Sequence, residues 1–380
     1  MMLLLAILTA LVTDTARTDL TLSGQFGRGT LRVEGTQIGA FEVKAQSVYD
    51  FNAVSRVFGE ASYQWQDCKQ TLYVDNADFR LITPYLTIDT LGGDLRREIY
   101  SFYGGYRMLK NNILWHAALQ FRAEQSYRRR DPRAKNKVTD LHAELSIGYQ
   151  WNPYALSLMA YGGRYKQNNE IRFYSELGET TIYHMANDTE PYARFSSNNK
   201  SSYYSGYLAG ASLRLLPTRG FIAAINYDWF NYVKELTINT QVPIVALNTH
   251  KFTAQFGYVA QHWRVIATGG VELKLGKQYI YGDNSNNYYQ LLFVLRNYQK
   301  NLVIANVYGD YRLPLPIGDI LFAGRVDYDM FLQHFQESIQ VQYTFPLKNK
   351  FSWFVAPKAS LHQYEKAHSW QVILATGLTF

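Results

Sequence analysis

Apolar and polar residues alternate with a period of two along most of this chain. Such alternation predicts β-strands, because successive strand side chains point to opposite faces of a sheet. In residues 113–124 the odd positions are apolar, while the even positions are mostly polar, with examples at His116 and Gln120. The last stretch, 370–380, alternates in the same way and ends on the C-terminal residue. The pattern therefore predicts an all-β protein.

Sixteen such stretches follow one another along the chain. They are residues 20–33, 41–51, 57–65, 100–108, 113–125, 141–151, 154–165, 207–215, 221–229, 252–258, 263–275, 303–313, 320–330, 338–345, 351–361 and 370–380. Glycine weakens a strand, and the first stretch contains Gly24, Gly27 and Gly29. A count of fourteen strands is the alternative.

Short turns and long connections separate these stretches in strict alternation. Short turns occur, for example, at Lys110–Asn112 and Leu216–Gly220. The long connections are 66–97, 126–140, 166–205, 234–249 and 276–301. Bacterial outer-membrane barrels have an even strand number, short periplasmic turns and long extracellular loops. The order predicts a single antiparallel transmembrane β-barrel of about 16 strands, with every long connection outside.

The terminal stretch also carries a resemblance. A strand edge cannot stay unpaired in lipid, so a membrane sheet must close by pairing its last strand with its first. An alternating terminal strand that ends in Phe is similar to the assembly signal of bacterial outer-membrane β-barrel proteins. The residues that carry this signal are Trp370, Val372, Leu374, Leu378 and Phe380.

Composition agrees with a barrel. The 380 residues include 31 Tyr, 21 Phe and 7 Trp, with 18% charged residues, and the mean hydropathy is −0.24. Aromatic girdles and the alternation of lipid-facing with lumen-facing residues give this combination. The formal net charge of +7 comes without a nucleic-acid motif, so a nucleic-acid partner is not expected. The single Cys68 excludes an intrachain disulfide, and no cofactor or metal site is predicted.

The amino terminus points to export. Residues 1–12 form an apolar run of secretory length, too short for a spanning helix. No Lys or Arg precedes the run, and Asp14 is poorly placed for cleavage. We therefore expect residues 1–18 to be a signal peptide or an atypical leader and residues 19–380 to form the barrel, in the outer membrane of a Gram-negative bacterium.

A narrower resemblance rests on an ordered set of loop and strand-end motifs. They are Leu81-Ile82-Thr83-Pro84-Tyr85, Asp89-Thr90-Leu91-Gly92-Gly93-Asp94, the strand 100–106, Asp131-Pro132-Arg133 and Gly162-Gly163-Arg164-Tyr165-Lys166. In this order they resemble an uncharacterised family of Bacteroidota outer-membrane β-barrels. The resemblance implies a fold and a compartment without an activity. Outer-membrane lipid and the barrel-assembly machinery are the implied partners, with a surface lipoprotein or an energised receptor as further candidates.

The face expected to line the lumen carries both signs of charge. Its basic residues are Lys44, Arg107, Arg122, Arg214, Lys251, Arg264, Lys274, Arg312, Arg325 and Lys358. Its acidic residues are Glu42, Glu60, Glu124, Glu144, Asp228, Glu272, Asp310, Asp327 and Asp329. A strongly ion-selective pore shows one dominant sign. The balance fits either a weakly selective aqueous channel or a mutually paired, partly closed interior.

An enzymatic function has weak support. Lumen or rim residues of the types found in catalytic triads are His116, His142, His184, Ser146 and Asp188. Triads are recognised by geometry, and no nucleophile-elbow motif is present. The chain is therefore not expected to be an enzyme, and a barrel-embedded hydrolase is the weakest of the three hypotheses.

Two other functions lead. The first is a pore or uptake channel for a small solute or lipid, because sixteen strands enclose a lumen. The alternative is a non-transporting subunit of a larger outer-membrane complex that docks partners through its long loops. The longest connection, 166–205, carries apolar residues such as Phe173 and Tyr192. We expect it to fold into the mouth and to pair Arg172, Glu176, Glu179, Asp188, Glu190 and Arg194 with the lumen charges.

Overall fold

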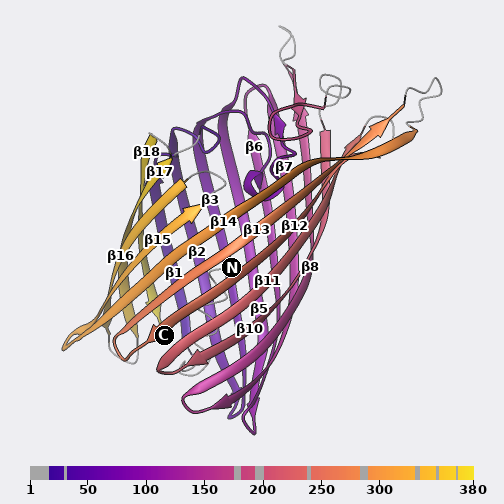
Figure 1. The fold of residues 1–380 in the computed structure, drawn as a ribbon. Helices are drawn as coiled ribbons and strands as arrows, with labels where there is room; N and C mark the ends of the chain where they lie inside the picture. Colours follow the sequence, from indigo (N-terminus) through magenta and orange to yellow (C-terminus); the bar gives the residue numbers. More distant parts are fainter. Residues whose placement is uncertain are drawn as a thin grey trace.

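The chain forms a closed antiparallel barrel of sixteen strands (Figure 1). The computed structural model describes residues 17–29, 32–174, 181–192, 201–237, 241–282, 290–329, 334–347, 351–364 and 367–380. The barrel strands are β1 (Arg17–Gly27), β2 (Gln37–Asn52), β3 (Ser55–Thr71), β5 (Gly93–Lys110), β6 (Ile113–Arg128), β7 (Arg133–Trp151), β8 (Tyr154–Arg172), β10 (Ser201–Pro217), β11 (Gly220–Thr237), β12 (Gln241–Val259), β13 (Trp263–Tyr281), β14 (Leu291–Leu315), β15 (Gly318–Asp329), β16 (His334–Pro346), β17 (Ser352–Tyr364) and β18 (Ala367–Thr379). All sixteen predicted strands are present, so the fourteen-strand alternative is wrong.

The last strand closes the barrel against the first. β18 pairs antiparallel with β1 from Asp19 opposite Thr379 to Gly27 opposite Gln371. At the end of the chain, the Phe380 amide donates to the Thr18 carbonyl at 2.8 Å, and the Thr18 amide donates to the Phe380 carbonyl at 2.7 Å. Of the three glycines that were expected to weaken the first strand, Gly24 lies within it, Gly27 ends it and Gly29 lies beyond it. β1 begins two residues before the predicted start of the barrel at residue 19.

The two ends of the barrel differ in their connections. The end that carries the C-terminus, here the terminal end, has short turns, and the opposite end, here the loop end, lies at the top of Figure 1. The turn between β5 and β6 contains only Asn111 and Asn112, both with positive φ. Two consecutive positive φ angles match the twist of a hairpin, and Asn tolerates them better than most residues. This predicted turn is confirmed.

The outer face is apolar. Trp115, Leu119, Phe121, Val265 and Val271 on this face are all exposed, with Leu119 at 59%. The side chains that alternate with these along each strand point inward, and several of them are buried. A belt of exposed apolar side chains around a closed barrel is the surface that a lipid bilayer covers.

No helix in the described ranges is long and apolar enough to cross a membrane.

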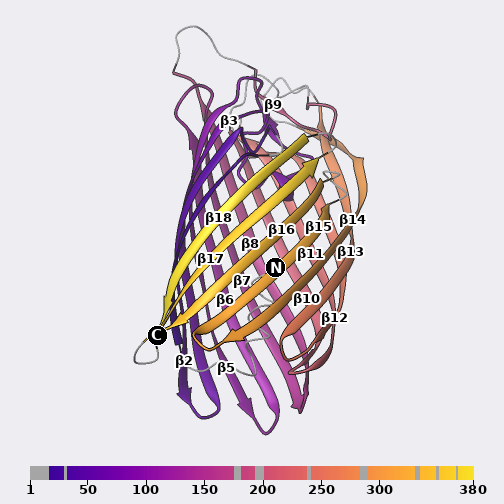
Figure 2. The ribbon, with the colours of Figure 1, turned by 90° about the vertical axis from the view of Figure 1, so that its left-hand side faces the viewer.

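The barrel has a high wall and a low wall, as comparison of Figures 1 and 2 shows. The high wall consists of β5–β8 and β10–β13, strands of 16–19 residues. The low wall consists of β15–β18 and β1, strands of 11–13 residues. About 9–11 residues suffice to span a bilayer, so the strands of the high wall extend well beyond it and those of the low wall do not.

This extension corrects three predicted loops. Residues 126–140, 234–249 and 276–301 are mainly strand, and the β6–β7 connection shrinks to residues 129–132. In residues 133–139 the outward side chains are polar or charged, such as Lys135 and Lys137, because they face water rather than lipid. The apolar signal of a membrane strand is therefore missing from this part of the high wall.

Residues 72–92, which we call the inner segment, fold into the barrel at the loop end. They contain the short helix α2 (Phe79–Ile82) and β4 (Thr87–Ile88), which pairs with β9 (Tyr183–His184) from the connection between β8 and β10. Ile82, Tyr85 and Thr87 have no exposed surface. The largest buried cluster joins the inner segment to the high wall through side chains such as Tyr165, Tyr204 and Tyr232. The main core is therefore at the mouth of the barrel.

Candidate functional site inside the barrel

The inner segment is held to the wall by a buried charge cluster. Arg128 at the end of β6 donates to Asp75 at 2.6 Å and to Asp89 at 2.5 Å, and all three side chains are almost fully buried. Asn136 and Asn169 donate to the Asp75 carbonyl at 2.6 and 2.7 Å. Because a broken buried ion pair leaves an uncompensated charge, this cluster fixes both ends of the segment to β6, β7 and β8.

The two carboxyls of this cluster titrate in opposite directions. Burial raises the pKa of Asp75 well above its ordinary range, and the charge of Arg128 only partly opposes it. Burial also acts to raise the pKa of Asp89, but the hydrogen bond with Asp75 and the charge of Arg128 outweigh it and lower that pKa. One proton held on Asp75 and donated to Asp89 explains both shifts.

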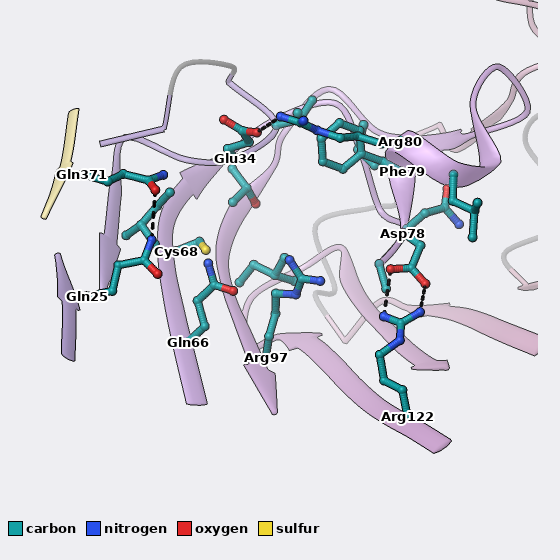
Figure 3. A pocket seen from close by; sticks show the side chains of 18 of the residues that line it. Gln25, Glu34, Gln66, Cys68, Asp78, Phe79, Arg80, Arg97, Arg122 and Gln371 are labelled. Atoms are coloured by element: carbon teal, nitrogen blue, oxygen red, sulfur yellow. Dashed lines mark hydrogen bonds and ion pairs between the residues drawn. The ribbon is translucent and has the colours of Figure 1, made fainter. Parts of the chain in front are cut away.

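A second anchor lies near α2. Arg122 of β6 binds the Asp78 carboxylate in a bidentate manner, and its Nη1 donates to Oδ1 at 3.0 Å. The Tyr165 hydroxyl donates to the same carboxylate at 3.1 Å. Charge-assisted, bidentate pairs of this kind fix orientation as well as position. Figure 3 shows Asp78 and Arg122 facing each other across the space beneath the inner segment. The start of α2 is therefore fixed to β6 and β8.

The far side of the inner segment is held through its backbone. Lys234 of β11 donates to the carbonyls of Tyr85 and Leu86 at 3.1 and 2.9 Å. Lys274 of β13 donates to the Arg80 carbonyl at 3.2 Å, and Tyr232 donates to the carbonyl of Ile82. The carbonyls of Ile82 and Leu86 also accept backbone amides, from Tyr85 and Met185, so side chains and backbone together satisfy the carbonyls of the segment inside the barrel. The segment thus spans from β6 to β13.

A cavity of about 460 Å³ remains on the other side of the inner segment (Figure 3). Its walls come from β1–β3, β5–β7 and β18, and its roof comes from the inner segment. Uncharged polar side chains from three strands line it, namely Gln25, Gln66 and Gln371, together with Cys68 and Thr71. Gln25 donates to Gln371 across the junction of β1 with β18 at 3.2 Å. The volume is within the usual range of small-molecule sites.

The charges that line this cavity are balanced and paired. Three acids, Glu34, Asp78 and Asp140, accompany three guanidinium groups, Arg80, Arg97 and Arg122. Arg80 contacts Glu34 at 2.8 Å, and Arg97 contacts Glu124 at 2.8 Å. A lining with this balance has no dominant sign with which to attract an ion.

A further polar cluster lies in the terminal half of the lumen. Glu144 accepts from Tyr103 at 2.6 Å and contacts His116 at 3.1 Å, while Tyr161 donates to Asp228. Arg214 is buried nearby, and its Nε and Nη1 have no hydrogen-bond partner among the described residues. Side chains therefore narrow the lumen below the cavity as well.

Most of the charges that were expected to line the lumen pair with one another. The pairs are Lys44 with Glu60 at 2.7 Å, Arg122 with Glu124 at 3.0 Å, Arg264 with Asp310 at 2.7 Å, Lys274 with Glu272 at 3.5 Å, and Arg325 with Asp327. Arg107, Glu144 and Arg214 are buried, Lys358 is half-buried and Arg312 is exposed. This arrangement favours the paired, partly closed interior over an open pore. The part of each residue in transport stays a prediction.

The residues considered for a triad are spread over the barrel. His116 bonds to Glu144, His142 contacts Asp140 at 2.7 Å, and His184 lies at the mouth beside Thr87. Ser146 is opposite His116 across β6 and β7. Among the described residues no group of three or more His, Cys, Asp or Glu side chains could hold a metal ion.

The described part of the connection 166–205 reaches the mouth with residues 181–192. Residues 166–172 belong to β8, and residues 175–180 and 193–200, with Glu176, Glu179 and Arg194, lie outside the described residues. Arg172 pairs with Glu170 of its own strand, and Asp188 and Glu190 lie near the surface. Residues 181–192 pack against the inner segment, which itself makes the constriction. The inner segment had a signal in the sequence in Ile82 and Tyr85, which supply apolar area that is costly to expose in an ordinary loop.

Comparison with known proteins places the chain in a family. A family model, described as a family of unknown function (DUF6850), matches residues 5–328. The chain belongs to this family. No curated protein matches it.

Solved structures describe the fold only. The chain is similar to a Pseudomonas aeruginosa FadL homologue, with a TM-score of 0.46 and 10% identity over 97% of this chain and 90% of that chain. It is also similar to the Ralstonia pickettii toluene transporter TbuX, with a TM-score of 0.43 and 8% identity over 97% of this chain and 90% of that chain. For CdiB from Acinetobacter baumannii the TM-score is 0.43 and the sequence identity is 8%, and this chain spans only 60% of that protein's length. At these identities and TM-scores no argument about function follows.

Proposed function

We propose that this protein is an outer-membrane channel for a small, polar, uncharged solute, and that the solute passes between the inner segment and the strands β18, β1, β2 and β3. The observation that carries the proposal is the position of the 460 Å³ cavity. It lies where the barrel wall is lined by Gln25, Gln66 and Gln371, while the opposite side of the lumen is filled by the anchored inner segment.

The chemistry of the lining supports this solute class. Amide and hydroxyl groups donate and accept hydrogen bonds without selecting a charge. The guanidinium and carboxylate groups of the cavity neutralise each other and leave no net field for an ion. The Gram-negative outer membrane, with its lipid and assembly machinery as partners and a Bacteroidota source, is part of the same proposal, and the apolar outer face supports its placement in a membrane.

Removal of the roof of the cavity tests the proposal. The Asp75 amide donates to the Thr87 carbonyl at 2.9 Å, so residues 77–86 can be replaced by two glycines while the Arg128 cluster stays in place. In planar bilayers the purified wild-type protein should give small current steps, and the shortened variant should give larger ones. Liposome swelling with sugars of increasing size should show the same difference.

The control separates an opened path from a damaged barrel. Both proteins must first migrate as folded barrels in unheated gels. Equal solute flux and equal current in two folded proteins would overturn the proposal and would favour a non-transporting subunit instead.

A further inference from the structure

The loop-end part of β14 has an open strand edge. β14 has 25 residues and β15 has 12, and their pairing begins only at Ile304. Residues 291–299 are next to β13 on one side, and in the described part of the chain no strand pairs with their other side. In Figure 1 the hairpin of β13 and β14 leaves the barrel outline at the upper right. An open edge presents a row of backbone donors and acceptors to another strand.

The same edge begins with an exposed apolar run. Residues 291–295 read Leu-Leu-Phe-Val-Leu, and every one of them is 44–57% exposed. The pairing with β13 shifts register at Leu292, yet residues on both sides of this irregularity are exposed, so both faces of the strand are uncovered. Lipid around the barrel covers only one face of a strand. An apolar surface of this kind marks an interface with protein.

We propose that two copies of the chain associate by pairing these edges antiparallel about a two-fold axis beside Phe293. In that register Phe293 lies opposite its own counterpart, Leu291 lies opposite Leu295, and Leu292 lies opposite Val294. The two hairpins then form one continuous four-stranded sheet. Each backbone edge gains the partners that it lacks in a single copy.

Self-complementarity identifies the occupant as a second copy. All five positions place an apolar side chain opposite an apolar side chain, and the next pair sets Arg296 opposite Gln290, so no like charges meet. The run contains no charge that would require a different, complementary partner. Two barrels in one membrane also present this edge at the same height, and isologous two-fold dimers are the commonest oligomers.

Disulfide crosslinking tests the register on the full-length protein. Directly opposed residues in an antiparallel pair have Cα atoms about 4.5–5.5 Å apart, which is within the range of a disulfide. In a Cys68→Ser background, Phe293→Cys should give a covalent dimer on mild oxidation. Leu291→Cys and Leu295→Cys should crosslink efficiently only when the two proteins are mixed in one membrane.

Two controls make the result decisive. Leu145→Cys places a thiol on the exposed outer face of β7, away from the edge, and should remain monomeric. Addition of Leu292→Lys and Val294→Lys to Phe293→Cys should abolish the dimer, because like charges then face each other. Every variant is checked for folded migration in an unheated gel. A folded Phe293→Cys protein that crosslinks no more than Leu145→Cys would overturn the proposal, as would a crosslinked fraction that the two lysines leave unchanged.

Discussion

The high wall and the low wall of this barrel use their inner faces differently. Arg128, Lys234 and Lys274 of the high wall bind the inner segment through buried contacts, and Arg122 binds it through a partly exposed one. On the low wall, Arg325 pairs with Asp327 of the same strand, and both side chains are partly exposed. The longer strands therefore hold the inner segment in place. The cavity lies at the junction of the low wall with β2 and β3, and the proposed path of the solute runs through it.

The largest expected effect breaks the anchor on the high wall. Arg128→Leu leaves Asp75 and Asp89 buried without their cation, which should cost about 3–5 kcal/mol. Arg325→Leu removes a partly exposed pair and should cost only about 0–1 kcal/mol. Unfolding by denaturant in lipid vesicles measures both free energies. Equal losses at the two sites would contradict the division of roles between the walls.

The next effect concerns the outer face. Leu119→Arg places a charge among exposed apolar side chains and should cost about 2–4 kcal/mol near the middle of the bilayer. The neighbouring Gln120→Arg turns inward and should cost much less. A reversible folding titration into vesicles compares them, and equal penalties would show that the assigned face is wrong.

The smallest expected effect is a dependence on pH. The raised pKa of Asp75 means that the folded protein keeps its proton where an exposed Asp has lost it. The retained proton stabilises the folded protein fully at pH values below the ordinary carboxyl pKa. This stabilisation is lost as the pH rises through the pKa that Asp75 has in the folded protein. The pKa of Asp89 is lowered in the folded protein, so its ionised carboxylate stabilises the fold at neutral pH. This stabilisation is lost only as the pH falls through the lowered pKa.

The inner segment should therefore loosen on the alkaline side, and channel current should rise there. Asp75→Asn keeps the uncharged form and should remove the alkaline rise while leaving the current at low pH unchanged. A rise of the same size in Asp75→Asn and in the wild-type protein would assign it to another group.

The alternation of apolar and polar residues was sufficient to predict the barrel, but it did not predict the inner segment or the pairing of the charges inside the lumen. Strands such as 113–124 are recognisable because lipid requires an apolar outer face. Beyond the bilayer, as in 133–139, the outer face becomes polar and the strands resemble loops. The inner segment has no period at all, since Asp75, Ile82 and Tyr85 are placed by contacts with strands distant in sequence. Pairing among the predicted lumen charges likewise depends on register that the sequence alone does not specify.

The central claim is that solute passes beside Gln371, and a thiol block tests it most directly. In a Cys68→Ser background, Gln371→Cys places a thiol in the cavity, whereas Gln363→Cys places one at an exposed position on β17. A bulky thiol reagent should reduce the current through the first variant and leave the second unchanged. Unchanged current through Gln371→Cys, after mass spectrometry has shown complete modification, would contradict the proposed path.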